Sequence, residues 1–441
     1  MTSRPDALLP FPDSTEVTSA GLAVGGCALT EIAAEFGTPL YLYDEQSIRT
    51  RGRSVVEAVS AGAVGSRAAF ALKSLSTLAV LRVLQQEGMS ADCASSGEIA
   101  AALRAGFVGS QLVVHGNAKS ETDLQAAVDA DAGLVVLDGR DDAERLAALC
   151  AQSGRTQDVL VRIAPGIDVD THRHIATGHH GSKFGMTPAE GAELLRTLPA
   201  GLRGRGLHVH LGSQILDAAP LVEAARWLPS FAKAEGIPLD VLDVGGGLGI
   251  PYLPGQDSPD PGTHTANLVA AITQVCADEG MPVPQIIVEP GRSIVGTAGT
   301  TLYSVLGIKK VGDGSTWVAV DGGMGDNLRV GLYGGTYAPV LAARPIDPST
   351  GSVRIAGRHC ESTDVLVDGI ELPEVHVGDV IAVPATGAYH QTMANTYNLF
   401  GRPAAVLVAD GGATLITRRE STEELFPVSY THLTLPTILR V

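Results

Sequence analysis

Eight short apolar segments recur between about residue 68 and residue 292, and their regular spacing limits the folds that are open to this chain. Valine, isoleucine, leucine and alanine dominate them, as in parallel strands that are buried on both faces. The eight segments are AAFALK (68–73), SADCAS (90–95), QLVVHG (111–116), GLVVLDG (133–139), DVLVRIAPG (158–166), GLHVHLGS (206–213), LDVLDVGGG (239–247) and QIIVEPGR (285–292).

The segments between these runs carry apolar residues at helical spacing, and several of them end in glycine, a common helix stop. Examples are LAVLRVLQQEG, SGEIAAALRAG and RDDAERLAALCAQSG. Eight strands that alternate with helices predict a TIM barrel. A doubly wound open sheet would show the same alternation, so the number of strands decides between the two architectures.

The rhythm changes after about residue 302, where strand-like runs follow one another with few helices between them. Runs such as TWVAVDGG, TDVLVDGI and AAVLVADGGATLITRRE predict an antiparallel β domain. The early segment PLYLYD is expected to pair with that domain. We therefore assign residues 1–45 to an N-terminal segment that pairs with the β domain, 46–302 to the barrel and 303–427 to the C-terminal β domain.

Residues 428–441, VSYTHLTLPTILRV, follow a charged segment abruptly. They resemble the adaptor-derived tails that end some translated environmental sequences, so we predict that this tail is not native. A genuine terminal strand is the alternative, because the threonine and leucine content of the tail would permit one.

Charge and cysteine usage narrow the function further. The chain has 31 basic and 48 acidic side chains, a net charge of −17 and no basic run, which argues against a nucleic-acid partner. Its five cysteines show no metal-ligand spacing, and no apolar run is long enough to span a bilayer. The first residues lack the apolar stretch of a secretory signal. These features predict a cytoplasmic enzyme without a metal site.

Polar residues follow the apolar runs, at the strand ends where TIM barrels place their active sites. Lys73 ends the first run, and in a dry pocket its amine could form a Schiff base with an aldehyde cofactor; the alternative is a lysine that reaches from the barrel rim into solvent. His115 ends the third run. Strand alternation places His208 and His210 of the sixth run on one face, where His210 could stack on a planar cofactor or be an ordinary core residue.

The last two runs end in groups that suit a phosphorylated cofactor. The glycines at 245–247 would let backbone N–H groups approach a phosphate, although a glycine triplet can also be a plain tight turn. Glu289 could pair with a protonated ring nitrogen and Arg292 with a phosphate or carboxylate; a rim salt bridge is the alternative. A lysine, a histidine, a glycine turn and a carboxylate at one barrel mouth together predict a pyridoxal 5′-phosphate site.

Motifs along the whole chain resemble those of the diaminopimelate decarboxylases. They are FALKS, SSGEIAAALRAGF, HGNAKS, PGIDVDTH, KFGM, HVHLGSQI, DVGGGLGI, EPGRSIV, DGGMGDNLRVGLY, RHCESTDVL and TGAYHQT. The resemblance extends from about residue 24 to about residue 425. It implies an alanine-racemase-like barrel that binds pyridoxal phosphate and is followed by a C-terminal β domain.

The resemblance also implies roles for single residues. Lys73 would hold the cofactor covalently, His210 would stack on its ring and Ser213 would bind near its phosphate. Further cofactor contacts would come from Gly246, Gly247, Glu289, Gly291, Arg292 and Tyr389. Substrate would be bound by Arg292, Arg329, Tyr333, Glu361 and Tyr389. Cys360, in the HCES motif, would supply the proton.

The implied reaction is decarboxylation of meso-2,6-diaminopimelate to L-lysine and CO₂, the last step of lysine biosynthesis. The implied assembly is a homodimer whose active sites are shared between chains. A decarboxylase of ornithine, lysine, arginine or carboxynorspermidine is the nearest alternative. A racemase would need opposed bases on the two ring faces, and the HCES motif does not match that pattern. Non-catalytic pyridoxal-phosphate proteins are typically the barrel alone, so the long β domain argues against one.

Overall fold

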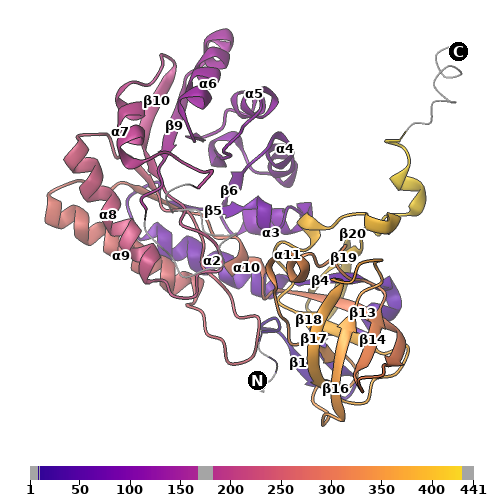
Figure 1. Cartoon of the computed structure of the whole chain (residues 1–441). Helices are drawn as coiled ribbons and strands as arrows, with labels where there is room; N and C mark the ends of the chain where they lie inside the picture. The colour runs from indigo at the N-terminus through magenta and orange to yellow at the C-terminus, as the bar shows by residue number, and fades with distance from the viewer. Residues whose placement is uncertain (1–7, 9, 167–181, 430–441) are drawn as a thin grey trace, which may run out of the picture. The chain divides into compact units, whose positions relative to one another are not determined.

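The computed structural model describes residues 8, 10–166 and 182–429. Part of the PGIDVDTH motif and most of the C-terminal tail lie outside the described residues. The chain forms two compact units (Figure 1). One comprises Glu45–Pro251 with Gly255–Ala298, and the other comprises Met1–Asp44, Tyr252–Pro254 and Gly299–Val441.

Parallel strands close into a barrel in the first unit, which confirms the predicted TIM barrel and excludes the open doubly wound sheet. Closure depends on the pairing of the last barrel strand with the first, where Ile287 and Val288 lie opposite Arg67 and Ala68. The strands are β5 (Arg67–Ala71), β6 (Ser90–Cys93), β7 (Leu112–Val114), β8 (Leu134–Leu137), β9 (Gln157–Arg162), β10 (Leu202–His208), β11 (Val241–Asp243) and β12 (Gln285–Val288).

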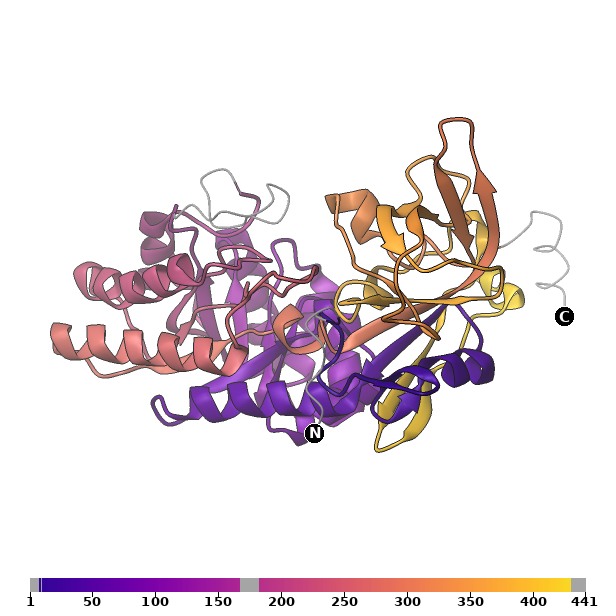
Figure 2. The ribbon, with the colours of Figure 1, turned by 90° about the horizontal axis from the view of Figure 1, so that it is seen from below.

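Helix α2 (Glu45–Ser60) precedes the first barrel strand, and the other helices of this unit follow barrel strands along the chain. The others are α3 (Leu78–Gln86), α4 (Ser96–Ala105), α5 (Glu121–Asp129), α6 (Arg140–Ser153), α7 (Pro188–Arg196), α8 (Ala219–Glu235), α9 (Pro261–Glu279) and the short α10 (Arg292–Val295). The side chains of Ser95, Ser120 and Thr187 cap the starts of α4, α5 and α7. Helices α8 and α9 pack side by side (Figures 1 and 2). Among the described residues, no helix is long and apolar enough to cross a membrane.

Small and branched apolar side chains form a core cluster of the barrel. This cluster consists of Ala69, Val113, Leu134, Val136, Leu160, Val241 and Ile287. All seven belong to barrel strands, as the continuous apolar runs predicted. The polar groups of the site are therefore carried by the residues that end these strands or follow them.

The second unit contains a large sheet in the order β17-β16-β14-β13-β4-β19-β20, with β18 and β15 attached through β13. Its strands are β4 (Leu40–Asp44), β13 (Gly299–Lys310), β14 (Thr316–Val320), β15 (Val340–Leu341), β16 (Gly351–Ala356), β17 (Val365–Leu372), β18 (Val380–Pro384), β19 (Ala404–Ala409) and β20 (Gly412–Thr417). The N-terminal strand β4 lies between β13 and β19, which confirms that the segment PLYLYD joins this sheet.

Most neighbouring strands of this sheet are antiparallel, as predicted, but two pairs are parallel. Strand β4 runs parallel to β19, and β14 runs parallel to β16. Neither pair is joined by a tight hairpin, so the connections leave strand direction open. The same unit contains β1 (Glu16–Thr18), β2 (Gly21–Val24), β3 (Cys27–Ala28), α1 (Leu29–Phe36) and α11 (Arg329–Tyr333).

Candidate active site

Lys73 lies just beyond the first barrel strand, in a single 3-10 turn that spans Leu72–Ser74. The turn is anchored because Leu72 and Ser74 are buried and the Ser74 hydroxyl donates to the Ala71 carbonyl at 2.7 Å. Lys73 itself is exposed. Its amine is thus accessible from solvent while its backbone is held, which suits covalent attachment of a cofactor.

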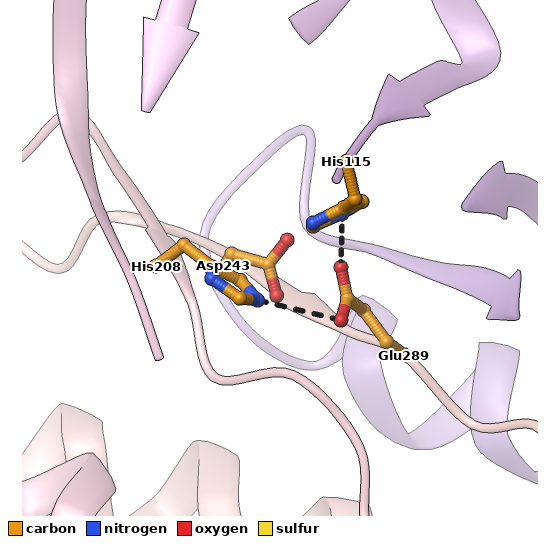
Figure 3. A group of neighbouring side chains, drawn as sticks. All are labelled: His115, His208, Asp243 and Glu289. Carbon is orange, nitrogen blue, oxygen red and sulfur yellow. Dashed lines mark ion pairs between the residues drawn. The ribbon is translucent and has the colours of Figure 1, made fainter. Parts of the chain in front are cut away.

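Glu289 is the centre of a buried polar group at the barrel mouth (Figure 3). Its Oε1 lies 2.5 Å from Nε2 of His115, and its Oε2 lies 3.5 Å from Nε2 of His208. Asp243 is the fourth member. His208 and Asp243 end β10 and β11, while His115 and Glu289 follow β7 and β12 directly. Four strand ends therefore converge on one site.

The pKa values of the two carboxyl groups in this cluster are shifted in opposite directions. Burial alone would raise the pKa of Glu289, but His115 and His208 outweigh burial and hold that pKa well below its usual value. Burial and then the neighbouring Glu289 raise the pKa of Asp243 well above its usual value. Burial also lowers the pKa of His208 to about 3. Glu289 is therefore ionised and His208 neutral at neutral pH, and Asp243 gives up its proton less readily than Glu289 does.

The glycine turn after β11 packs too tightly for any side chain. A Cβ on Gly246 would lie 2.1 Å from the Glu289 carbonyl oxygen, and Gly245 and Gly247 have φ of +66° and +115°. The Gly246 N–H donates to Nδ1 of His210 at 3.2 Å. Burial and then the Lys73 charge lower the pKa of His210 well below its usual value, so its ring is neutral. A flat neutral imidazole is a suitable surface for an aromatic cofactor ring.

Arg292 and Gly291 connect the end of β12 to the lysine turn. Arg292 starts α10, is buried, and donates from Nη2 to the Ser213 hydroxyl at 3.2 Å. A Cβ on Gly291 would meet the Ala71 and Ser74 side chains at 3.0 Å each. The cationic guanidinium and the hydroxyl form a pair that can bind a phosphate.

Sequence reasoning missed two charged groups of the barrel mouth. Asp92 Oδ1 lies 3.7 Å from Nε2 of His115, and burial raises the pKa of Asp92. Arg162 ends β9 and stacks over the Phe184 ring at 4.5 Å. Asp92 is the one charged residue of β6, and Arg162 ends β9 directly after the apolar residues 159–161. That signal, a lone charge late in a buried strand, could have identified them.

The remaining predicted site residues belong to the second unit. They are Arg329, Tyr333, Cys360, Glu361 and Tyr389. Arg329 stacks over the Tyr252 ring at 3.6 Å. Tyr389 adopts φ of +62°, a conformation that is rare for a bulky residue. Their positions relative to the barrel residues stay a prediction.

The HCES loop is held by a segment that sequence reasoning overlooked. The Cys360 N–H donates to Oδ1 of Asn398 at 3.0 Å, and the Tyr397 hydroxyl donates to Oε1 of Glu361 at 2.5 Å. Asn398 has φ of +55°. The Cys360 side chain is exposed, so the loop is fixed through its backbone while its thiol faces solvent.

Comparison with known proteins agrees with this geometry. Residues 45–296 match the model of the pyridoxal-dependent decarboxylases, pyridoxal binding domain. A diaminopimelate decarboxylase of Actinosynnema pretiosum subsp. auranticum is 43% identical over 94% of each chain. One from Bacillus subtilis (strain 168) is 38% identical over 92% of this chain and 94% of its own length. The chain belongs to the diaminopimelate decarboxylase family.

Solved structures give the same result. The diaminopimelate decarboxylase of M. jannaschii in co-complex with L-lysine superposes with a TM-score of 0.87 at 31% identity, covering 96% of this chain and 99% of that one. A lysine/ornithine decarboxylase of Vibrio vulnificus, complexed with putrescine, gives 0.72 at 25% identity, with 87% and 98% covered. The family uses pyridoxal phosphate, and the barrel mouth contains groups that suit its aldehyde, ring nitrogen and phosphate.

Proposed function

We propose that this protein converts meso-2,6-diaminopimelate to L-lysine and CO₂, the last step of lysine biosynthesis, in the cytoplasm. The observation that carries the proposal is Glu289, a buried carboxylate held ionised by two histidines at the barrel end that also holds the Lys73 turn. When bound, pyridoxal phosphate accepts the electron pair left by the departing carboxylate, provided that its ring nitrogen is protonated. An ionised Glu289 favours that protonated state.

Each barrel residue has a proposed task in this reaction. Lys73 carries the cofactor, and its exposed amine can exchange with the substrate amine. His210 supports one face of the ring. The phosphate is bound by Ser213, Gly246, Gly247, Gly291 and Arg292.

The second unit supplies substrate recognition and the proton. Diaminopimelate has an amino-acid group at both ends, so its binding needs more cationic and hydroxyl partners than ornithine does. Arg329 and Tyr333, with Arg292, would bind the substrate carboxylates, while Glu361 would bind the distal amine and Tyr389 would lie near both ligands. Cys360 donates the proton that replaces the lost carboxylate; the residue is exposed, and Asn398 holds its backbone.

A product assay on a panel of diamino acids tests the substrate. We expect turnover of meso-diaminopimelate to exceed that of lysine, ornithine and arginine. Arg329→Met should cost on the order of 2–5 kcal/mol of transition-state binding. Arg344→Met is a matched control, because Arg344 is an arginine of the same unit that pairs with Asp379. Equal turnover of ornithine and diaminopimelate would contradict the assignment.

Borohydride reduction tests the role of Lys73. The reagent should fix the cofactor to the protein, and peptide mapping should find it on Lys73. Labelling of a different lysine would remove the central residue from the proposed site.

We also propose a homodimer in which Lys73 of one chain and Cys360 of the other serve the same active site. Lys73→Ala and Cys360→Ala chains should each be nearly inactive. Refolded together, they should recover roughly a quarter of the sites, since half of the dimers are mixed and each mixed dimer has one intact site. Activity that stays at the level of the single variants would show that both residues come from the same chain.

A further inference from the structure

The buried group in Figure 3 contains more polar side chains than contact with a ring nitrogen requires. Glu289 alone could pair with the pyridine, yet His115, His208 and Asp243 surround it with their ligand atoms all within 4.8 Å of one another. Each is less than a tenth exposed. Burial of so many polar groups costs free energy unless they interact favourably with one another.

The two histidines contact different oxygens of the same carboxylate. His115, which follows β7, has its Nε2 2.5 Å from Oε1 of Glu289. His208, which ends β10, has its Nε2 3.5 Å from Oε2. Their rings meet edge to face, with centroids 4.9 Å apart and planes at 62°. Contacts on both oxygens fix the plane of the carboxylate, and mutual packing restricts rotation of the rings.

The tautomer of His208 follows from the same contacts. Among the described residues, neither ring nitrogen of His208 has a hydrogen-bond partner of good geometry, but Nε2 lies 3.5 Å from Oε2 of Glu289 and so has an acceptor within reach. A buried N–H without an acceptor costs more than a bare nitrogen whose lone pair is unused. The proton of the neutral ring is therefore on Nε2, where it faces the carboxylate.

The surrounding charges concentrate the negative charge on Glu289. Burial and then Glu289 raise the pKa of Asp243, and burial raises the pKa of Asp92, a second neighbouring carboxyl group. Arg162, Lys73 and Arg67 are cations whose charges reach carboxyl groups of this site. The arrangement thus favours one anion at one position among three neighbouring carboxyl groups.

We propose that His115 and His208 are positioning residues that fix the direction and the ionisation of Glu289 toward the cofactor ring. This inference rests on the proposed function, because it assigns Glu289 to the ring nitrogen. It predicts that loss of either histidine weakens cofactor binding through Glu289, before any substrate is present.

The test compares His115→Leu and His208→Leu with His264→Leu. His264 lies in α9 of the same unit, is also buried, and has a pKa that burial lowers to about 4. We expect cofactor release from the holoenzyme to be faster on the order of tenfold in the first two variants, by analogy with the loss of a group that orients a metal ligand. The His264→Leu protein should release it at the wild-type rate.

A double-mutant cycle separates positioning from general damage to the fold. In a Glu289→Gln background, His115→Leu should change the release rate by less than about twofold, because its effect is transmitted through the carboxylate. An equal loss in both backgrounds would overturn the proposal. His115→Gln and His208→Gln, which retain an N–H donor, should recover part of the binding, and they serve as folded variants if a leucine variant does not fold.

Two further outcomes have a definite meaning. Four donors of this kind can also hold a transition metal. A stoichiometric metal in the wild-type holoenzyme that His208→Gln loses would overturn the proposal in favour of a metal site. Because the readout is cofactor release, a protein that fails to decarboxylate diaminopimelate but shows the predicted cycle would refute the proposed substrate and leave this inference standing.

Discussion

A buried ion pair in the barrel wall offers a quantitative test of how this fold is stabilised. Lys119 has a fully buried side chain whose ammonium lies 2.6 Å from Oδ2 of Asp142. The ammonium also donates to the carbonyls of Gly116 and Val136, at 2.7 and 2.8 Å. Its three hydrogens thus have three acceptors, of which one is charged. Burial nevertheless lowers the pKa of Lys119.

The two partners should not be equivalent. Asp142→Asn leaves the ammonium with neutral acceptors alone and removes its paired charge, so that Asp138 is the remaining acidic neighbour, and it should cost about 3–5 kcal/mol. Lys119→Met leaves Asp142 with the Asp138 N–H and the Arg145 guanidinium, each at 3.3 Å. Asp142 also stands in the first turn of α6, where the helix dipole favours an anion. We therefore expect Lys119→Met to cost only about 1–3 kcal/mol.

The unfolding of the barrel can be followed separately. Trp227 stacks on Phe231 within α8, and Trp317 lies in β14 of the second unit. A Trp317→Phe background leaves Trp227 as the single tryptophan, so that its fluorescence in guanidinium titrations reports on the barrel. Asp141→Asn is the matched control, because Asp141 is the exposed neighbour in the same helical turn.

The outcome of this series is decisive in either direction. The control should stay within about 0.5 kcal/mol of the parent protein. The double variant Lys119→Met/Asp142→Asn should lose less stability than the sum of the two single losses, because each single change leaves the other group without its ion-pair partner. Additive losses, or an Asp142→Asn cost no larger than that of Asp141→Asn, would refute the reasoning.

Four other expectations follow from local geometry. His264 has a folded pKa of about 4, below its unfolded value, so its contribution is complete above about pH 6.5 and is lost as pH falls toward 4; in urea titrations, His264→Leu should reduce the acid loss by up to about 3 kcal/mol. Gly246→Ala should weaken cofactor absorbance because its Cβ would meet a backbone oxygen, whereas Gly139→Ala, with open space around it, should not. Asn398→Gly keeps the positive φ but removes the Cys360 acceptor, so kcat should fall and the rate of thiol alkylation should change, with Leu399→Gly, also at positive φ, as control. A chain that ends at Pro427 should keep its activity and thermal midpoint, since Val428 is 88% exposed; a large loss would show that the tail is native structure.

The barrel was predictable because buried parallel strands leave an unambiguous signal. All eight apolar runs correspond to observed strands. The exception in detail is β10, which begins at Leu202, before the apolar run at 206–213. The first residues of this strand include Arg203 and Arg205, which form ion pairs with Asp158 on the neighbouring strand β9. A strand end that reaches the polar rim carries no apolar pattern, so sequence reasoning starts the strand too late.

The two parallel pairs within the second unit were not predictable, for a different reason. Alternation and turn residues show where strands are, but partners that are far apart in sequence can pair in either direction. Strand β13 illustrates the limit, because its first half pairs with β4 and β18 and its second half with β14. Its residues are buried at one end and exposed at the other, so no single period describes it.

The choice between two carboxylates shows what only the three-dimensional structure can decide about the site. Asp243 ends β11 and Glu289 follows β12, so either could have been the partner of a ring nitrogen. When the environments of two titratable groups shift their pKa values in opposite directions, the shifts indicate which group is ionised. Here the histidines contact Glu289 and lower its pKa, while burial and then the Glu289 anion raise the pKa of Asp243. The ionisation of Glu289 thus depends on His115, which follows β7, and on His208, which ends β10. His115 lies more than 150 residues before Glu289 in the sequence, and His208 lies about half as far away. Because those contacts are long-range, the sequence could nominate Glu289 but could not explain why it, and not Asp243, carries the charge.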